Sequence, residues 1–117
     1  MGDFFMGSDV GPPGGSQPYM AVVEIAFAAS PYTMPSTSTE VHVDTSGGNV
    51  IINMPAASSV RKVRYVVKKT TADANTVTVT RAGADTIDGA ATAVLLGGTR
   101  GSLGLTGPLT GADFKVT

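Results

Sequence analysis

Short apolar runs separated by turn residues follow one another along most of the chain. They lie at residues 20–28, 39–43, 49–54, 62–67, 76–80, 93–96 and 113–117, and Gly, Pro, Asp or Asn stands in most of the connections. Several runs alternate between apolar and polar side chains, and no segment has the periodicity of an amphipathic helix. Short strands at a spacing of roughly ten residues predict an all-β fold, a small antiparallel β-sandwich or barrel.

Alternation within the runs also predicts which side chains face the core, because successive side chains of a strand point to opposite sides. The residues expected to face inward are Val50, Ile52 and Met54 in the third run, Val63, Tyr65 and Val67 in the fourth, and Val77 and Val79 in the fifth.

The first 18 residues differ from the rest of the chain. They hold five of the fifteen glycines and three of the seven prolines, and the stretch GPPGG can neither sustain a helix nor pair well as a central strand. We therefore expect a flexible Gly/Pro-rich N-terminal arm over residues 1–18 and a single β domain over residues 19–117. Phe4, Phe5 and Met6 leave two alternatives for the arm, a disordered terminus or a segment that docks on a neighbouring molecule.

Composition limits the size of the core. A chain of 117 residues forms one domain, and its apolar residues are mostly Ala and Val, with no Trp. Few side chains therefore bring the large buried area that aromatic residues supply. Part of the stability is expected to come from partner subunits.

Charge and cysteine content exclude several classes of protein. Eight Lys and Arg against nine Asp and Glu give a net charge of -1, so neither nucleic acid nor an acidic membrane surface is an expected partner. Without cysteine there are no disulfides, which fits maturation in a reducing cytoplasm. The N-terminus lacks the pattern of a secretory signal, and every apolar run is interrupted well short of the ~20 residues that span a bilayer.

Catalytic equipment is sparse in this sequence. His42 is the single histidine, and its position between Val41 and Val43 predicts that it points away from the core, as a surface or interface residue. No nucleophile motif such as GxSxG accompanies it. We therefore expect a protein that is not an enzyme.

Three aspartates and one glycine-rich segment are the remaining candidates for ligand binding. Asp73, Asp85 and Asp88 suit either a calcium site or tight turns in which the carboxylate accepts hydrogen bonds from nearby amides, and the turn interpretation is favoured because no Asp-x-Asp-x-Asp-Gly loop is present. Residues 97–104, GGTRGSLG, lack the GxxxxGK[ST] pattern of a phosphate loop. We expect neither a metal nor a cofactor.

Basic residues gather around the fourth run. Arg61, Lys62, Arg64, Lys68 and Lys69 fall within nine positions, and alternation places Lys62, Arg64 and Lys68 on the outward face. Such a face either binds acidic groups of a partner or, as a solvated charged strand, discourages edge-to-edge aggregation. We take Arg61, Lys62, Arg64 and Lys68, together with Phe4, Phe5 and Met6, as the candidate partner-binding residues.

Four motifs occur in a recognisable order: HVDTSGGNVIINMP at 42–55, YVVKKTTADANTVTV at 65–79, ADTIDGA at 84–90 and GADFKVT at 111–117. This order resembles a module that recurs in bacteriophage virion proteins, especially tail-fibre and capsid-associated β domains, and the resemblance covers residues 41–117. The closing strand of that module often carries Trp where this chain has Phe114, which indicates a divergent member.

The resemblance implies a virion structural protein that is made in the host cytoplasm. Because the chain is a single domain with a short arm and no internal repeat, unlike a long fibre, we expect a capsid decoration or cement protein. Such a protein would bind the major capsid protein on the outside of the shell, as a homotrimer, and stabilise the shell against the pressure of packaged DNA. The alternatives are a small tail, neck or fibre-tip component and a carbohydrate-binding module.

Overall fold

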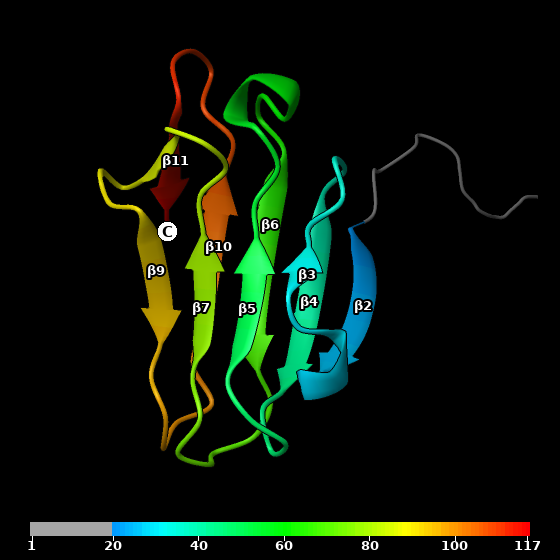
Figure 1. Ribbon diagram of the computed structural model, residues 1–117. Coiled ribbons are helices and arrows are strands. Elements are labelled where there is room, and N and C mark those ends of the chain that lie inside the picture. The colour runs from blue at the N-terminus through cyan, green and yellow to red at the C-terminus, as the bar shows by residue number, and fades with distance from the viewer. Residues whose placement is uncertain (1–19) are drawn as a thin grey trace, which may run out of the picture.

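The computed structural model describes residues 20–117, which form two β-sheets (Figure 1). In spatial order, the six-stranded sheet contains β2 (Ala21–Ala26), β4 (Thr39–Asp44), β6 (Arg64–Lys69), β10 (Ser102–Thr106), β11 (Asp113–Val116) and β8 (Thr86–Ile87). The four-stranded sheet contains β3 (Tyr32–Thr33), β5 (Val50–Asn53), β7 (Val77–Thr80) and β9 (Thr92–Leu95). Two short 3-10 helices, η1 (Phe27–Ala29) and η2 (Ala57–Ser59), lie in the connections. The described part of the chain is all-β, as predicted, whereas the arm predicted over residues 1–18 lies outside it.

From β2 to β7 the chain winds as a coil that alternates between the two sheets. The strands β2, β4 and β6 belong to one sheet, and β3, β5 and β7 belong to the other (Figure 1). Successive strands within each sheet are parallel, with Ala21 opposite Thr39 and Val50 opposite Val77. Each connection therefore crosses from one sheet to the other instead of closing a hairpin.

The direction of the strands reverses after β7. β9 pairs antiparallel with β7, and β10 pairs antiparallel with both β6 and β11. The two-residue strand β8 then pairs parallel with β11 at the far edge of the six-stranded sheet. The last third of the chain thus closes one end of the coil, while β2 and β3 form the edges at its other end.

The predicted antiparallel arrangement is wrong for the coil. The Gly, Asp and Pro residues between the runs do mark turns, as expected, but a turn residue shows only that the chain changes direction. In this protein the turn Asp44–Gly48 carries the chain from β4 in one sheet to β5 in the other. The Thr/Val strand β7 likewise pairs with β5 and β9 rather than with the segment next to it in sequence.

Inward side chains of both sheets meet in one hydrophobic core. The residues predicted to face inward are buried, and only Val63 among them is partly exposed. Ile87, Leu105 and Phe114 from the last third of the chain complete the core. The buried Tyr65 hydroxyl donates a hydrogen bond to the Pro35 carbonyl oxygen at 2.6 Å, and burial raises the pKa of Tyr65 to about 12.

Most of the predicted strands are confirmed within one or two residues, but the two-residue strands β3 and β8 and the longer strand β10 were missed. The β10 sequence SLGLT follows the segment GGTRG and contains Gly104, which weakens the strand pattern. Gly104 lies against the C-terminal residue, because a Cβ at this position would be 2.4 Å from the Thr117 hydroxyl oxygen. Within residues 20–117, no helix is long and apolar enough to cross a membrane.

Candidate functional site

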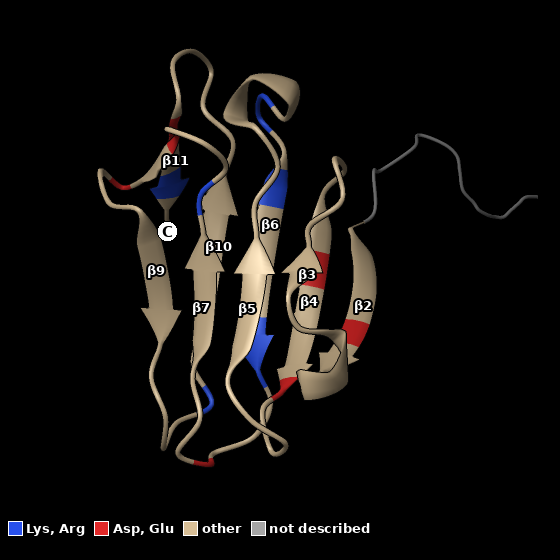
Figure 2. Ribbon diagram, in the orientation of Figure 1, with Lys and Arg blue, Asp and Glu red and all other residues tan. Residues whose placement is uncertain are grey.

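The outward face of the six-stranded sheet carries charges of opposite sign on different strands (Figure 2). We call this surface the charged face. Glu24 on β2 and Glu40 and Asp44 on β4 form its acidic strip, and Arg64 and Lys68 on β6 form its basic strip. On β11 the outward Asp113 and Lys115 pair with each other. The two strips lie side by side because β4 and β6 are neighbours in the sheet.

His42 lies at the border between the two strips. The strand register places it opposite Glu24 on one side and opposite Lys68 on the other. Its Nε2 atom is 2.5 Å from the Oε2 atom of Glu40, and its neighbours Val41 and Val43 are buried. The prediction that His42 points away from the core is therefore confirmed.

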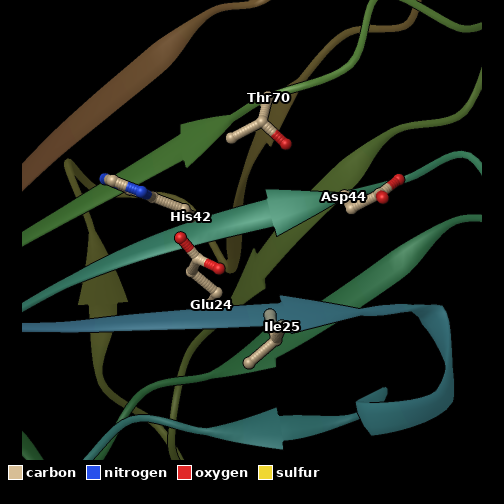
Figure 3. A pocket seen from close by; sticks show the side chains of 5 residues that line it. All are labelled: Glu24, Ile25, His42, Asp44 and Thr70. Atoms are coloured by element: carbon tan, nitrogen blue, oxygen red, sulfur yellow. The ribbon is translucent and has the colours of Figure 1, made fainter.

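A shallow pocket of about 260 Å³ opens beside His42 (Figure 3). It is lined by Glu24, Ile25, His42, Asp44 and Thr70. Figure 3 shows the Glu24 and His42 side chains on the same side of the sheet, with Ile25 pointing to the other side. The pocket is thus a hollow in the acidic strip, bordered by side chains that donate or accept hydrogen bonds.

The four predicted basic residues do not all share one strand face. Arg64 and Lys68 do point outward from β6, but Arg61 and Lys62 precede the strand, and Lys62 has a left-handed φ of 62°. The Arg61 guanidinium donates a hydrogen bond to the Gly111 carbonyl oxygen, and the Lys68 ammonium donates one to the Arg100 carbonyl oxygen, both at 2.5 Å. Phe4, Phe5 and Met6 lie outside the described residues.

Lys69 is buried in a network of loop carbonyls. Its side chain is fully buried, and its Nζ atom donates hydrogen bonds to the carbonyl oxygens of Thr71, Asp73 and Thr99, the last two at 3.2 and 3.1 Å. The Asp73 Oδ1 atom lies 3.6 Å from the same ammonium. Lys69 therefore joins the loop after β6 to the loop before β10. The alternation that places Lys68 outward also places Lys69 inward, so the burial of Lys69 could have been predicted from the sequence.

The turn interpretation is confirmed for Asp73, and the other two aspartates bind amides from distant segments. Asp73 Oδ1 accepts hydrogen bonds from the Thr45 hydroxyl at 2.7 Å and from the Asn75 amide at 3.1 Å. Asp85 accepts a hydrogen bond from the Ala57 amide at 2.8 Å, and Asp88 lies 3.5 Å from the Val116 amide. These carboxylates connect segments of the chain that lie far apart in the sequence.

We expect the protein to lose stability below about pH 4, the usual carboxyl pKa. Hydrogen bonds from the hydroxyls of Thr45 and Thr71 lower the pKa of Asp73 to about 2, and bonds from Lys115, the Gly89 amide and Thr86 lower the pKa of Asp113 to about 2. Because both folded-state pKa values are depressed, the stabilisation is present above the unfolded pKa and is lost as the pH falls from about 4 through 2. The melting temperature, measured by circular dichroism from pH 5 to pH 2, should fall, and Asp73→Asn should reduce the fall. An unchanged melting temperature would contradict this prediction.

The outward face of the four-stranded sheet has a different chemistry, and we call it the threonine face. Its four strands contain no Lys, Arg, Asp or Glu (Figure 2). One row across the sheet is Ile51, Thr78 and Val94, and the next is Asn53, Thr80 and Thr92. Ile51, Val94 and Leu96, which follows β9, are exposed. This face thus offers hydroxyl, amide and apolar groups without charge.

The chain matches no family model, no curated protein and no solved structure. Within residues 20–117, no three His, Asp or Glu side chains are grouped so that they could hold a metal ion. Segment 97–104 lies partly in a turn and partly in β10. Just before that strand, the Gly101 carbonyl oxygen accepts a hydrogen bond from the Lys69 amide at 3.0 Å. The two outer faces are functional candidates in the described residues, because each offers a broad surface of distinct chemistry. The acidic strip was missed at the sequence level, although alternation with His42 places Glu40 and Asp44 on one side.

Proposed function

We propose that this protein is a structural component of a bacteriophage virion and acts as a capsid decoration protein. In this proposal the two sheets form a sandwich from which residues 1–18 extend as an arm. The protein binds the major capsid protein on the outer surface of the shell as a homotrimer, and it stabilises the shell against the pressure of packaged DNA. It performs no catalysis.

The positions of the recognised motifs in the fold support this proposal. The turn Asp44–Gly48 links β4 to β5, Pro55 follows β5, and Thr86–Gly89 contains β8. Phe114, which stands where the phage module often has Trp, is fully buried in β11. The motifs thus build the connections and the closing strand of the coil, which are the parts that would be shared by proteins of one fold.

The single observation that carries the proposal is the difference between the two outer faces. A decoration protein has to contact two kinds of neighbour, its own copies and the shell. The charged face has opposite charges arranged in strips, whereas the threonine face exposes Ile51, Val94 and Leu96 without any charge on its strands. We assign the threonine face to the shell, because burying it leaves no unpaired charge at the contact.

Mass action explains how such a contact would stabilise a capsid. A ligand that binds only the assembled shell lowers the free energy of that state, and the effect grows with the concentration of the free ligand. Several weak contacts within one oligomer add through avidity, so each single contact can remain weak. Stabilisation of the shell therefore requires no large interface between the capsid and any one copy of the protein.

Binding to undecorated capsids of the virus that encodes the protein tests the proposal. We expect the full-length protein to cosediment with these capsids and to raise the temperature at which they open. Val94→Lys should weaken binding at least tenfold, because it places a charge among the exposed apolar side chains of the threonine face. Leu109→Lys is the matched control, since Leu109 is also exposed but lies in the loop between β10 and β11.

A second variant tests the contribution of the arm. Deletion of residues 2–17 should leave the circular dichroism spectrum of the domain unchanged and weaken capsid binding at least tenfold. Equal binding by the truncated protein would remove the arm from the mechanism. If the full-length protein failed to bind capsids and bound purified tails instead, the decoration role itself would be wrong.

A further inference from the structure

The arrangement of charge on the charged face is directional across the strands. The acidic strip occupies β2 and β4, the basic strip lies on the adjacent strand β6, and the paired Asp113 and Lys115 on β11 add no net charge. Neighbouring strands are about 4.8 Å apart, so the face changes sign within the width of one strand. The charge varies little along the strands, because Arg64 and Lys68 lie at opposite ends of β6 and Glu40 and Asp44 at opposite ends of β4.

This direction decides how two copies can meet. If two charged faces are related by a rotation axis parallel to the strands, the β2 side of one copy lies opposite the β6 to β11 side of the next. The acidic strip of one copy then faces the basic strip of the next. If the axis runs across the strands, like charges face each other, which opposes association. Both a dimer and a ring of three can be built around an axis parallel to the strands.

We propose that copies of this chain associate through the charged face, with the acidic strip of one copy paired with the basic strip of its neighbour. A second copy is the occupant that this charge pattern favours, because every copy presents the same two strips of opposite sign at the same spacing. A polyanion such as nucleic acid would meet the repulsion of Glu24, Glu40 and Asp44 together with the attraction of the basic strip.

The exposed ends of the two strips have groups available for such pairing. Glu24 and Arg64 are both exposed, and within residues 20–117 the Arg64 guanidinium has no ion-pair partner. Lys115 already pairs with Asp113 at 2.9 Å, so we expect it to contribute less than Arg64 and Lys68. The Lys68 ammonium donates a hydrogen bond to the Arg100 carbonyl oxygen, and the strand register places Lys68 level with His42 and Glu24 across the sheet. The contact would therefore form between Glu24 of one copy and the outward residues of β6 in the next.

This inference names the surface for the self-association that the proposed function includes, but it does not rest on the capsid role, because the purified protein can be tested without any capsid. Light scattering at micromolar concentration and low salt should give a mass of at least twice the 11.8 kDa of one chain. Raising the NaCl concentration to about 0.5 M should weaken association, since salt screens exposed charges. Glu24→Lys alone and Lys68→Glu alone should each weaken association at least tenfold, because an axis parallel to the strands brings these two residues together at the same height.

Exchanging one charge of the acidic strip with one charge of the basic strip gives the decisive test. The double variant Glu24→Lys with Lys68→Glu exchanges two opposite charges that lie level with each other across the sheet, so it should recover association, which a general loss of folding would not allow. All variants should melt within a few degrees of the natural protein, because exposed charges contribute little to stability. Val94→Lys should remain associated, so loss of capsid binding and loss of self-association can be told apart. A monomer at low salt, or a double variant no better than the single ones, would overturn the proposal.

Discussion

Replacing Lys69 with methionine should lower the free energy of unfolding by about 4 kcal/mol, because removing one partner of a buried ionic network leaves the others without compensation. Methionine has nearly the same length but cannot donate to the carbonyl oxygens of Thr71, Asp73 and Thr99 that Lys69 binds. Buried acceptors that lose their donors cost about 1 to 3 kcal/mol each. For a domain of this size the melting temperature should fall by about 15 °C.

The adjacent residue gives the matched control. Lys68 differs from Lys69 by one position and points to the outward face, where its ammonium contacts a single carbonyl oxygen. Lys68→Met should therefore change the free energy of unfolding by less than about 1 kcal/mol. Chemical denaturation of both variants measures the difference. Equal stability of the two variants would show that the buried ammonium contributes nothing specific.

Gly107→Ala should destabilise the protein by about 3 kcal/mol, at the upper end of the range for inserting one methyl group into a closely packed site. A Cβ at this position would lie 1.8 Å from the Val60 carbonyl oxygen, which is part of the backbone and cannot rotate away. The Gly107 amide donates to the Val63 carbonyl at 2.8 Å, and the Gly107 carbonyl accepts from the Lys62 amide at 3.1 Å. The new methyl group would force these two segments apart and break both hydrogen bonds.

A second glycine separates this clash from a general intolerance of alanine. At Gly101 the added Cβ would meet the Leu95 Cδ2 atom at 3.3 Å, and a leucine side chain can shift by a few tenths of an ångström. Gly101→Ala should cost less than about 1 kcal/mol in the same denaturation experiment. If Gly107→Ala unfolded at the same denaturant concentration as Gly101→Ala, the close approach of the two backbones would not be a constraint on the fold.

The strands and their inward faces could be predicted from the sequence because alternation is a local property. Val50 and Ile52, or Val77 and Val79, reveal the buried side of a strand without any knowledge of its neighbours. The pairing could not be predicted, since alternation says nothing about which strand lies beside another. Ala21 pairs with Thr39 across a whole turn of the coil, and the intervening residues pass through the other sheet.

The candidate surfaces were predictable only in part, for the same reason. Arg64 and Lys68 were placed outward correctly, but the opposition of an acidic and a basic strip follows from the pairing of β4 with β6. Lys62 was placed wrongly because the strand begins at Arg64, two residues later than expected. The ligands of Lys69 come from three loop positions, and no spacing in the sequence indicates that they converge.

The alternating coil also determines how this chain must fold. Every parallel pair joins segments separated by roughly twenty residues or more, so each requires the closure of a long loop before its hydrogen bonds can form. The pair β10 and β11 is more local, with Leu105 opposite Val116. The pair β6 and β10, with Tyr65 opposite Leu105, closes a longer loop than any of the parallel pairs, so the β10–β11 end joins the coil only through a long-range contact. Such a topology has a high contact order, and the entropy of loop closure, rather than the strength of any one contact, sets the rate at which the native state is reached.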